Sequence, residues 1–190
     1  QPLIMGAKTG RCLILVTPDA QRTMNTYLGA GVELSPNDVD EEMITNAQVT
    51  YLEGYLFDPQ NAKQAFIKAA ATAHAAGHRV ALSLSDPFCV DRHRSDFLRL
   101  VENHVDILFA NEDEIKSLFM QDKFEDAASA ISEHVEIAAL TRSEKGAVIR
   151  NGSHEFTIPA APVENVIDTT GAGDQFAAGF LYGFTAGKDL

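Results

Sequence analysis

The stretch "VIDTTGAGDQFAAGFLYGF" (166–184) joins a short apolar run to a glycine-rich turn and then to an apolar pattern at helical spacing. The apolar run predicts a strand over 163–168, and the pattern after the turn predicts a helix over about 173–187. Three phenylalanines recur every four residues and are expected on the core face of that helix: Phe176, Phe180 and Phe184. A strand that turns directly into a helix is a building unit of α/β folds.

The rest of the chain alternates strands and helices in the same way. Strands are predicted over 11–17, 48–55, 79–85, 105–111 and 135–141, and helices over 34–47, 59–76, 91–104, 112–119 and 124–134. Residues 146–158 contain two β runs around Asn151–Gly152, which is a strong hairpin signal. This order predicts one α/β domain of three layers, in which helices flank a mostly parallel sheet.

Composition restricts the class of protein. The 190 residues are 45% apolar and 22% charged, which is typical of a folded domain with a sizeable core. The net charge of −12 argues against a nucleic-acid partner, because phosphate backbones demand Lys and Arg. No apolar run approaches the ~18 residues of a membrane span, and no secretory signal is visible. Cys12 and Cys89 are therefore expected to be reduced, buried thiols of a cytoplasmic protein.

The glycine-rich turn carries the clearest chemistry. Gly171, Ala172 and Gly173 lead into the helix, whose first N–H groups lack intrahelical partners and favour an anion such as phosphate. A carboxylate repels that anion, so Asp174 is useful there if it takes the proton of a hydroxyl that attacks phosphorus. The alternative is that Asp174 only caps the helix. The segment does not match the dinucleotide-binding motif G-x-G-x-x-G, because Phe176 occupies the sixth position.

Three segments together resemble one known family. "DTTGAGD" (168–174), followed by "FAAGF" (176–180), resembles the C-terminal signature of the PfkB, or ribokinase-like, family of carbohydrate and nucleoside kinases. "NEDEIKSLF" (111–119) is similar to the family's N-x-x-E element, and "LTRSEKGAVI" (140–149) to its nucleotide-contacting strand and turn. The resemblance implies a ribokinase-like fold. Residues from about 1 to 30 would belong to lid strands and 31–190 to the α/β core, with N- and C-terminal parts of the family lacking.

The resemblance also implies a role for each matching residue. Asp174 would be the catalytic base. The anion-hole and phosphate positions match Thr170, Gly171, Ala172 and Gly173, with Arg22 expected to reach the phosphates. The ATP-binding positions match Asn111, Thr141, Ser143 and Gly146. Asn111 and Glu114 would hold Mg²⁺ through water, and Asp168 and Thr170 match positions that bind a monovalent cation such as K⁺. Ser143 departs from the pattern, because glycine is usual there.

Plainer interpretations of these residues stay open. Asn111 and Glu114 suit the first turn of a helix whether or not they bind a ligand. The segment from Thr141 to Gly146 fits a tight turn, and Arg22 fits a solvated surface. Glu53, Tyr55 and Asp86 lie at strand ends, so in a parallel sheet they would face the ligand crevice. Glu53 as a rim charge and Tyr55 as a packing residue are the alternatives.

We therefore expect an ATP- and Mg²⁺-dependent kinase that phosphorylates a primary hydroxyl group. The segments "LVTPDAQRTMNTYLGAGVEL" (15–34) and "EGYLFDP" (53–59) look most like bacterial adenosine-kinase-like members, so adenosine is favoured over ribose or fructose. The alternatives are a sugar kinase, a kinase of a vitamin-like alcohol and a non-catalytic nucleotide-binding module. The expected partner is a small-molecule acceptor, and the expected state is a monomer or homodimer.

Overall fold

The computed structural model describes residues 6–190 and contains a six-stranded sheet in the order β3-β4-β5-β6-β7-β8. Four strands run parallel: β3 (Val49–Glu53), β4 (Arg79–Ser83), β5 (Ile107–Asn111) and β6 (Ile137–Thr141). The last two, β7 (Ala147–Asn151) and β8 (His154–Ile158), are antiparallel and form the hairpin predicted at Asn151–Gly152. The mostly parallel sheet with a local antiparallel pair is thus confirmed.

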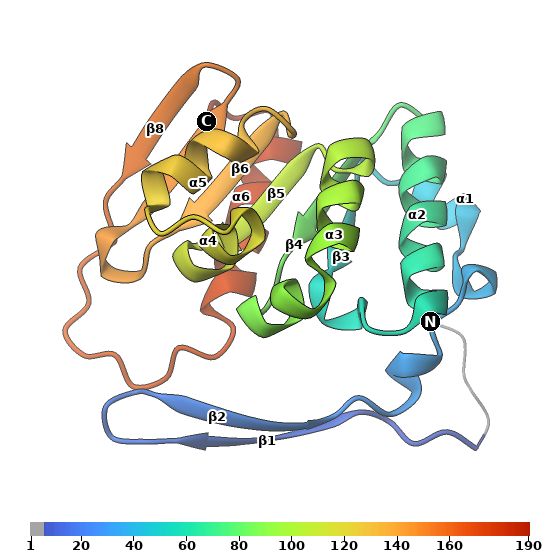
Figure 1. Cartoon of the computed structure of the whole chain (residues 1–190), viewed down its shortest axis with the longest axis horizontal. Coiled ribbons are helices and arrows are strands. Elements are labelled where there is room, and N and C mark those ends of the chain that lie inside the picture. The colour runs from blue at the N-terminus through green and yellow to red at the C-terminus, as the bar shows by residue number, and fades with distance from the viewer. Residues whose placement is uncertain (1–5) are drawn as a thin grey trace.

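Helices cover both faces of this sheet (Figure 1). One face carries α2 (Gln60–Ala75), α3 (Pro87–His104), α4 (Glu112–Phe119) and α5 (Phe124–Ile131). The other face carries α6 (Ala172–Thr185). The predicted three-layer α/β arrangement is confirmed.

The alternation of side chains along each strand separates two cores. In β5, Leu108 and Ala110 pack toward α2–α5, whereas Ile107 and Phe109 pack toward α6. The rings of Phe109 and Phe180 meet edge to face with centroids 5.4 Å apart. The phenylalanines of α6 form its core face as predicted: Phe176, Phe180 and Phe184 all pack against the smaller core.

The parallel strands bring distant residues to one edge of the sheet. Glu53 is the register partner of Ser83, and Asn111 is the register partner of Thr141, so the carboxyl ends of β3 to β6 lie side by side. Ligands of open α/β sheets bind in the crevice outside this edge.

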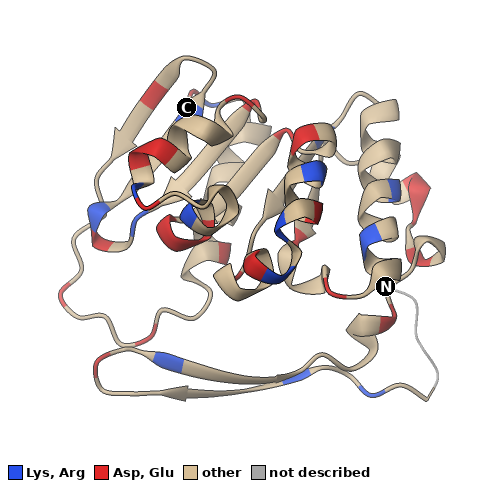
Figure 2. Ribbon diagram, viewed as in Figure 1, with Lys and Arg blue, Asp and Glu red and all other residues tan. Residues whose placement is uncertain are grey.

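A two-stranded ribbon lies outside the sheet along the same end of the molecule (Figure 1). It consists of β1 (Arg11–Val16) and β2 (Arg22–Tyr27), and every residue of both strands is exposed. Its strands contain two arginines, Arg11 and Arg22, and no acid (Figure 2). The ribbon is separate from the six-stranded sheet, its role as a lid stays a prediction, and residues 1–5 lie outside the described residues.

The single helix expected over 34–47 is wrong. The structure has short 3-10 turns at Gly29–Glu33 and Pro36–Asp38, and then a five-residue helix, α1 (Glu41–Thr45). The Asp38 carboxylate accepts hydrogen bonds from the backbone N–H and the hydroxyl of Ser35, at 2.9 and 2.8 Å. These bonds close a single 3-10 turn. Extended backbone at Val39 and Asp40 separates this turn from α1.

Two further expectations are also wrong. The segment 163–168 is not a strand, and Val166 and Ile167 are exposed there. β8 is the last strand of the described sheet, and residues 163–168 pair with none of its strands. Cys12 lies exposed on the ribbon, whereas Cys89 is buried as expected, and both thiols are free. No helix in residues 6–190 combines the length and apolar character needed to span a membrane.

Candidate active site

The glycine-rich turn (168–174) delivers Asp174 to the carboxyl edge of the sheet. Gly171 occupies the N-cap position of α6 with φ +77°, a left-handed conformation that suits glycine, and Asp174 lies exposed in the first helical turn. The cap has no side-chain hydrogen bond, so Asp174 is not the cap residue. An exposed carboxylate in the first turn of a helix is accessible to a ligand, and negative charge is favourable there.

Hydrogen bonds inside the turn decide which N–H groups can meet a ligand. The Ala172 N–H donates to the Thr169 carbonyl at 3.1 Å, and the Thr170 N–H donates to Asp168 Oδ1 at 2.8 Å. Within the described residues, the N–H groups of Gly171 and Gly173 have no such partner. An anion could therefore bond to these two groups without breaking a hydrogen bond of the turn, and among residues 6–190 the Asp174 N–H has no partner there either.

The ribbon meets the turn through Arg22. Its Nη1 donates to the Thr169 hydroxyl at 2.7 Å, although 147 positions separate the two residues. Beside it, Asp168 Oδ1 also accepts from the Thr170 hydroxyl at 2.7 Å. The hydrogen bonds from Thr170, with the charge of Arg22, hold the pKa of Asp168 below its usual range. The structure thus places a cation of the ribbon next to the proposed anion site.

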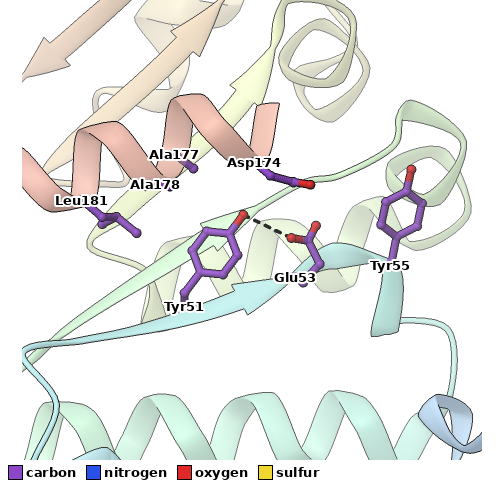
Figure 3. Close-up of a pocket in the computed structure, with 7 residues that line it drawn as sticks. All are labelled: Tyr51, Glu53, Tyr55, Asp174, Ala177, Ala178 and Leu181. Carbon is purple, nitrogen blue, oxygen red and sulfur yellow. Dashed lines mark hydrogen bonds between the residues drawn. The ribbon is translucent and has the colours of Figure 1, made fainter. Parts of the chain in front are cut away.

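A cavity of about 370 Å³ opens between β3 and α6 (Figure 3). Its seven lining residues are Tyr51, Glu53, Tyr55, Asp174, Ala177, Ala178 and Leu181. Glu53 extends into it from the strand, and Asp174 from the helix opposite (Figure 3). The fold thus brings Glu53 and Tyr55 together with Asp174, which is far from both in the sequence.

The cavity perturbs its own titratable groups. Burial raises the pKa of Glu53 to about 7, and the negative charge of Asp174 acts in the same direction. Burial likewise raises the pKa of Tyr51, with the nearby Glu53 charge as the second cause. The pKa of Tyr55 is raised by burial and by Asp86. Titratable groups with perturbed pKa values in a cleft are typical of functional sites.

Asn111 and Glu114 form a reciprocal capping box at the start of α4. The Glu114 N–H donates to Asn111 Oδ1 at 2.9 Å, while Asn111 donates from its backbone to Glu114 Oε2 at 2.8 Å and from its amide to Oε1 at 2.7 Å. Glu114 is 6% exposed, and burial raises its pKa to about 7, with Asp86 and Glu53 contributing. The capping interpretation is correct, and it leaves one lone pair on each carboxylate oxygen for a further donor.

The acids at this edge suit Mg²⁺ only as an ion that arrives with phosphates. Among residues 6–190, no three His, Cys, Asp or Glu side chains gather into a metal site. Mg²⁺ keeps several waters and binds through one or two carboxylates together with substrate phosphates. Glu114, whose oxygens already accept from Asn111, fits such a site through water rather than by direct coordination.

Comparison with known proteins settles the family. The description "pfkB family carbohydrate kinase" matches residues 3–190. The chain belongs to the pfkB family. A probable sugar kinase from Rhizobium etli CFN 42 is 50% identical with a TM-score of 0.92, over 95% of this chain and 55% of that chain. The adenosine kinase of Sinorhizobium meliloti is 48% identical with a TM-score of 0.93, over 96% and 56% of the two chains.

More distant pfkB relatives agree with this assignment. An uncharacterized sugar kinase of Archaeoglobus fulgidus is 26% identical over 96% of this chain and 71% of its own length. The adenosine kinase of Saccharomyces cerevisiae is 28% identical over 96% of this chain and 56% of its own. The chain spans about 55% of the two solved structures just named. The expected ribokinase-like fold is confirmed.

The turn between β6 and β7 has a defined geometry. Thr141 ends β6, and the Arg142 N–H donates to the Gly146 carbonyl at 2.8 Å to close the turn. Ser143 has φ +52°, a left-handed value that explains why glycine is usual in the family at this position. Gly146 has φ +87°, and a Cβ there would lie 2.0 Å from the Ile158 carbonyl oxygen. Gly146 is therefore required by a close backbone approach, independently of any nucleotide.

Two polar residues that bond to Glu53 were missed by sequence reasoning, namely Tyr51, which lines the cavity, and Ser85, which lies outside its lining. Tyr51 donates to Glu53 Oε2 at 3.1 Å, and the Ser85 hydroxyl donates to Glu53 Oε1. The period-2 alternation of β3 was a usable signal for Tyr51, since it puts residues 51 and 53 on one face. Nothing local in the sequence marked Ser85, because its hydrogen-bond partner Glu53 lies 32 positions earlier in the chain.

Proposed function

We propose that this protein is an ATP-dependent phosphotransferase that phosphorylates a primary hydroxyl group of a nucleoside or sugar. The observation that carries the proposal is the position of Asp174, exposed in the first turn of α6 and lining the cavity opposite Glu53. Asp174 is the proposed catalytic base. It would accept the acceptor's hydroxyl proton while that oxygen bonds to the γ-phosphorus and the bond from phosphorus to the ADP oxygen breaks.

The turn supplies the proposed anion hole. The N–H groups of Gly171 and Gly173 and the positive end of α6 would stabilise charge on the transferred phosphoryl group. Ala172 and Thr170 would shape the turn, since their N–H groups are already bonded within it. Arg22, held at Thr169, would reach the phosphates from the ribbon, because a guanidinium fork suits phosphate oxygens.

ATP would lie along the ends of β5 and β6. Asn111, Thr141, Ser143 and Gly146 are the proposed nucleotide contacts, supported by the adjacent register of Asn111 and Thr141. Mg²⁺ would neutralise phosphate charge, and Glu114 would hold it through water. Binding of a monovalent cation such as K⁺ at Asp168 and Thr170 stays a prediction. The cytoplasm is the proposed setting, where free thiols stay reduced.

Adenosine is the favoured acceptor, with Glu53 and Tyr55 in the acceptor cavity. Its support is the likeness, at 48% identity, to a protein named as an adenosine kinase. The likeness at 50% identity to a probable sugar kinase keeps ribose and fructose as the second candidates. A kinase of a vitamin-like alcohol stays open, and a non-catalytic module is disfavoured because Asp174 is present. The oligomeric state stays a prediction of monomer or homodimer.

The test is phosphoryl transfer from Mg·ATP to adenosine, ribose and fructose by the whole protein, with a reaction lacking acceptor as the control. We expect the highest kcat/KM for adenosine. A higher kcat/KM for a free sugar would replace adenosine as the acceptor. ATP binding without transfer to any of the three would favour another alcohol or the non-catalytic module, and a wider acceptor panel would separate these two.

A further inference from the structure

The position of the Glu53 carboxyl group is fixed at the corner where β3 ends beside β4. Glu53 accepts hydrogen bonds on both oxygens, from Tyr51 at 3.1 Å and from the Ser85 hydroxyl. Ser85 itself has φ +67°, in the left-handed region that residues other than glycine seldom adopt. Backbone strain of this kind concentrates at functional sites.

Gly54 makes this corner possible. A Cβ at Gly54 would lie 2.6 Å from the Leu84 carbonyl oxygen and 2.8 Å from that of Ser83, closer than real Cβ contacts. Only glycine therefore lets the chain leaving β3 pass so near the end of β4. This approach brings the hydroxyl of Ser85 within reach of Glu53, the residue just before the glycine.

We propose that Ser85 and Tyr51 are positioning residues that hold the Glu53 carboxyl group toward the cavity, where it binds a second hydroxyl group of the phosphate acceptor. The inference rests on the proposed function, since it presumes an acceptor in this cavity. A carboxylate offers about four lone-pair positions. Tyr51 and Ser85 use two of them, so the others can accept from a substrate hydroxyl.

The cavity walls define the class of acceptor. Glu53 and Asp174 face it from opposite sides, so two hydroxyl groups of one molecule can be bound at once, one at each carboxyl group (Figure 3). Ala177, Ala178 and Leu181 give α6 an apolar surface that continues from Asp174 along the helix (Figure 3). A pentose or hexose ring has this character, because it carries several hydroxyls around an apolar carbon face.

The groups around Glu53 predict a pH signature for this arrangement. Tyr51 faces it from β3, the hydroxyls of Ser83 and Ser85 from the end of β4, and Asp174 from α6, with the charge of Glu114 farther away on α4. The pKa of Glu53 is about 7, so the ionised, accepting form increases through neutral pH. A hydroxyl donor favours that ionised form, so removal of the Ser85 hydroxyl moves the pKa of Glu53 upward.

The test compares Ser85→Ala with Ser85→Gly in the whole protein. Both remove the hydroxyl, but glycine accepts a φ of +67° and alanine does not, so hydroxyl loss and backbone strain are separated. We expect both variants to lower acceptor kcat/KM by about tenfold or more, mainly through KM, because a hydrogen bond to a charged group is lost. The KM for ATP stays unchanged, and the midpoint of the rise of kcat/KM with pH moves to higher pH. Tyr51→Phe acts in the same direction.

Ser132→Ala is the matched control, because its hydroxyl bonds to the Ala128 carbonyl at the end of α5. Wild-type kcat/KM and pH midpoint in Ser85→Gly would overturn the proposal. Carboxyl NMR titration of Glu53 in the wild type and in Ser85→Ala supplies a readout that needs no turnover. An unchanged Glu53 pKa there would overturn the proposal even if the kinase activity is established. A raised pKa without transfer to any acceptor would count against the proposed function alone.

Discussion

Two carboxyl groups reach the same cavity by opposite routes. Asp174 is placed by its own neighbours in the sequence, through a left-handed Gly171 and the first turn of α6, and its side chain is exposed. Glu53 is placed by contacts between strands, with Ser85 and Tyr51 on its oxygens, and burial raises its pKa to about 7. The acid placed by its sequence neighbours stays accessible at the surface, whereas the acid placed by tertiary contacts is partly buried and has its pKa changed by its surroundings.

Of the predicted effects, the largest is the loss of catalysis when Asp174 is substituted. Asp174→Asn keeps the shape of the turn but removes the proposed base, so kcat should fall by about 10²- to 10⁴-fold while ATP binding remains measurable. Asp126→Asn is the matched control, because Asp126 is an exposed acid in the first turn of α5. Turnover and nucleotide titration measure the two effects. A variant that keeps more than about a tenth of the wild-type rate would remove Asp174 from the role of base.

The next effect is on stability at the Glu53 corner. Gly54→Ala would place a Cβ against the backbone of Leu84, and forced shifts of this kind cost about 1–3 kcal/mol. Gly179→Ala in α6 is the control, because nothing lies within 4 Å of its Cβ position. That substitution should stabilise the protein by up to about 1 kcal/mol, since alanine is the better helix former. Urea unfolding compares the two, and equal stability would mean that the close approach at Gly54 is not constraining.

The smallest effect is the pH dependence of stability. The pKa of Glu53 is raised on folding from an ordinary value of 4.5 to about 7, so the folded state holds more protons between these values. The contribution of Glu53 is therefore fully present below pH 4.5 and declines as pH rises toward 7. Wild type should lose stability relative to Glu53→Gln over that range, as measured by urea midpoints.

Glu102→Gln, at an exposed position of α3, is the control for this measurement. It should follow the wild-type pH profile. The raised pKa of Glu114 cancels between the wild type and Glu102→Gln, whereas Glu53→Gln lowers it somewhat, because the Glu53 charge is one of the causes that raise it. If Glu53→Gln and the wild type ran parallel from pH 4.5 to 7, folding would not raise the pKa of Glu53.

Sequence reasoning succeeded where the signal was local and failed where a neighbour decided the outcome. Helix α4 and the hairpin at Asn151–Gly152 carry their own start and turn signals, and both were predicted. The run over 163–168 has the apolar pattern of a strand, but in the described sheet no strand lies beside it. The helix expected over 34–47 was interrupted because Ser35 and Asp38 bond to each other and close a single turn.

The sequence by itself determined the α/β class, the family and the position of Asp174, because alternating apolar periods and a contiguous glycine-rich turn act over a few residues. Only the tertiary structure decided that Arg22 bonds to Thr169, that Glu53 faces Asp174 across a cavity and that Ser85 bonds to Glu53. These contacts join segments far apart in the chain. They depend on strand register, on the close approach at Gly54 and on burial, which arise only when the sheet and its helices pack together.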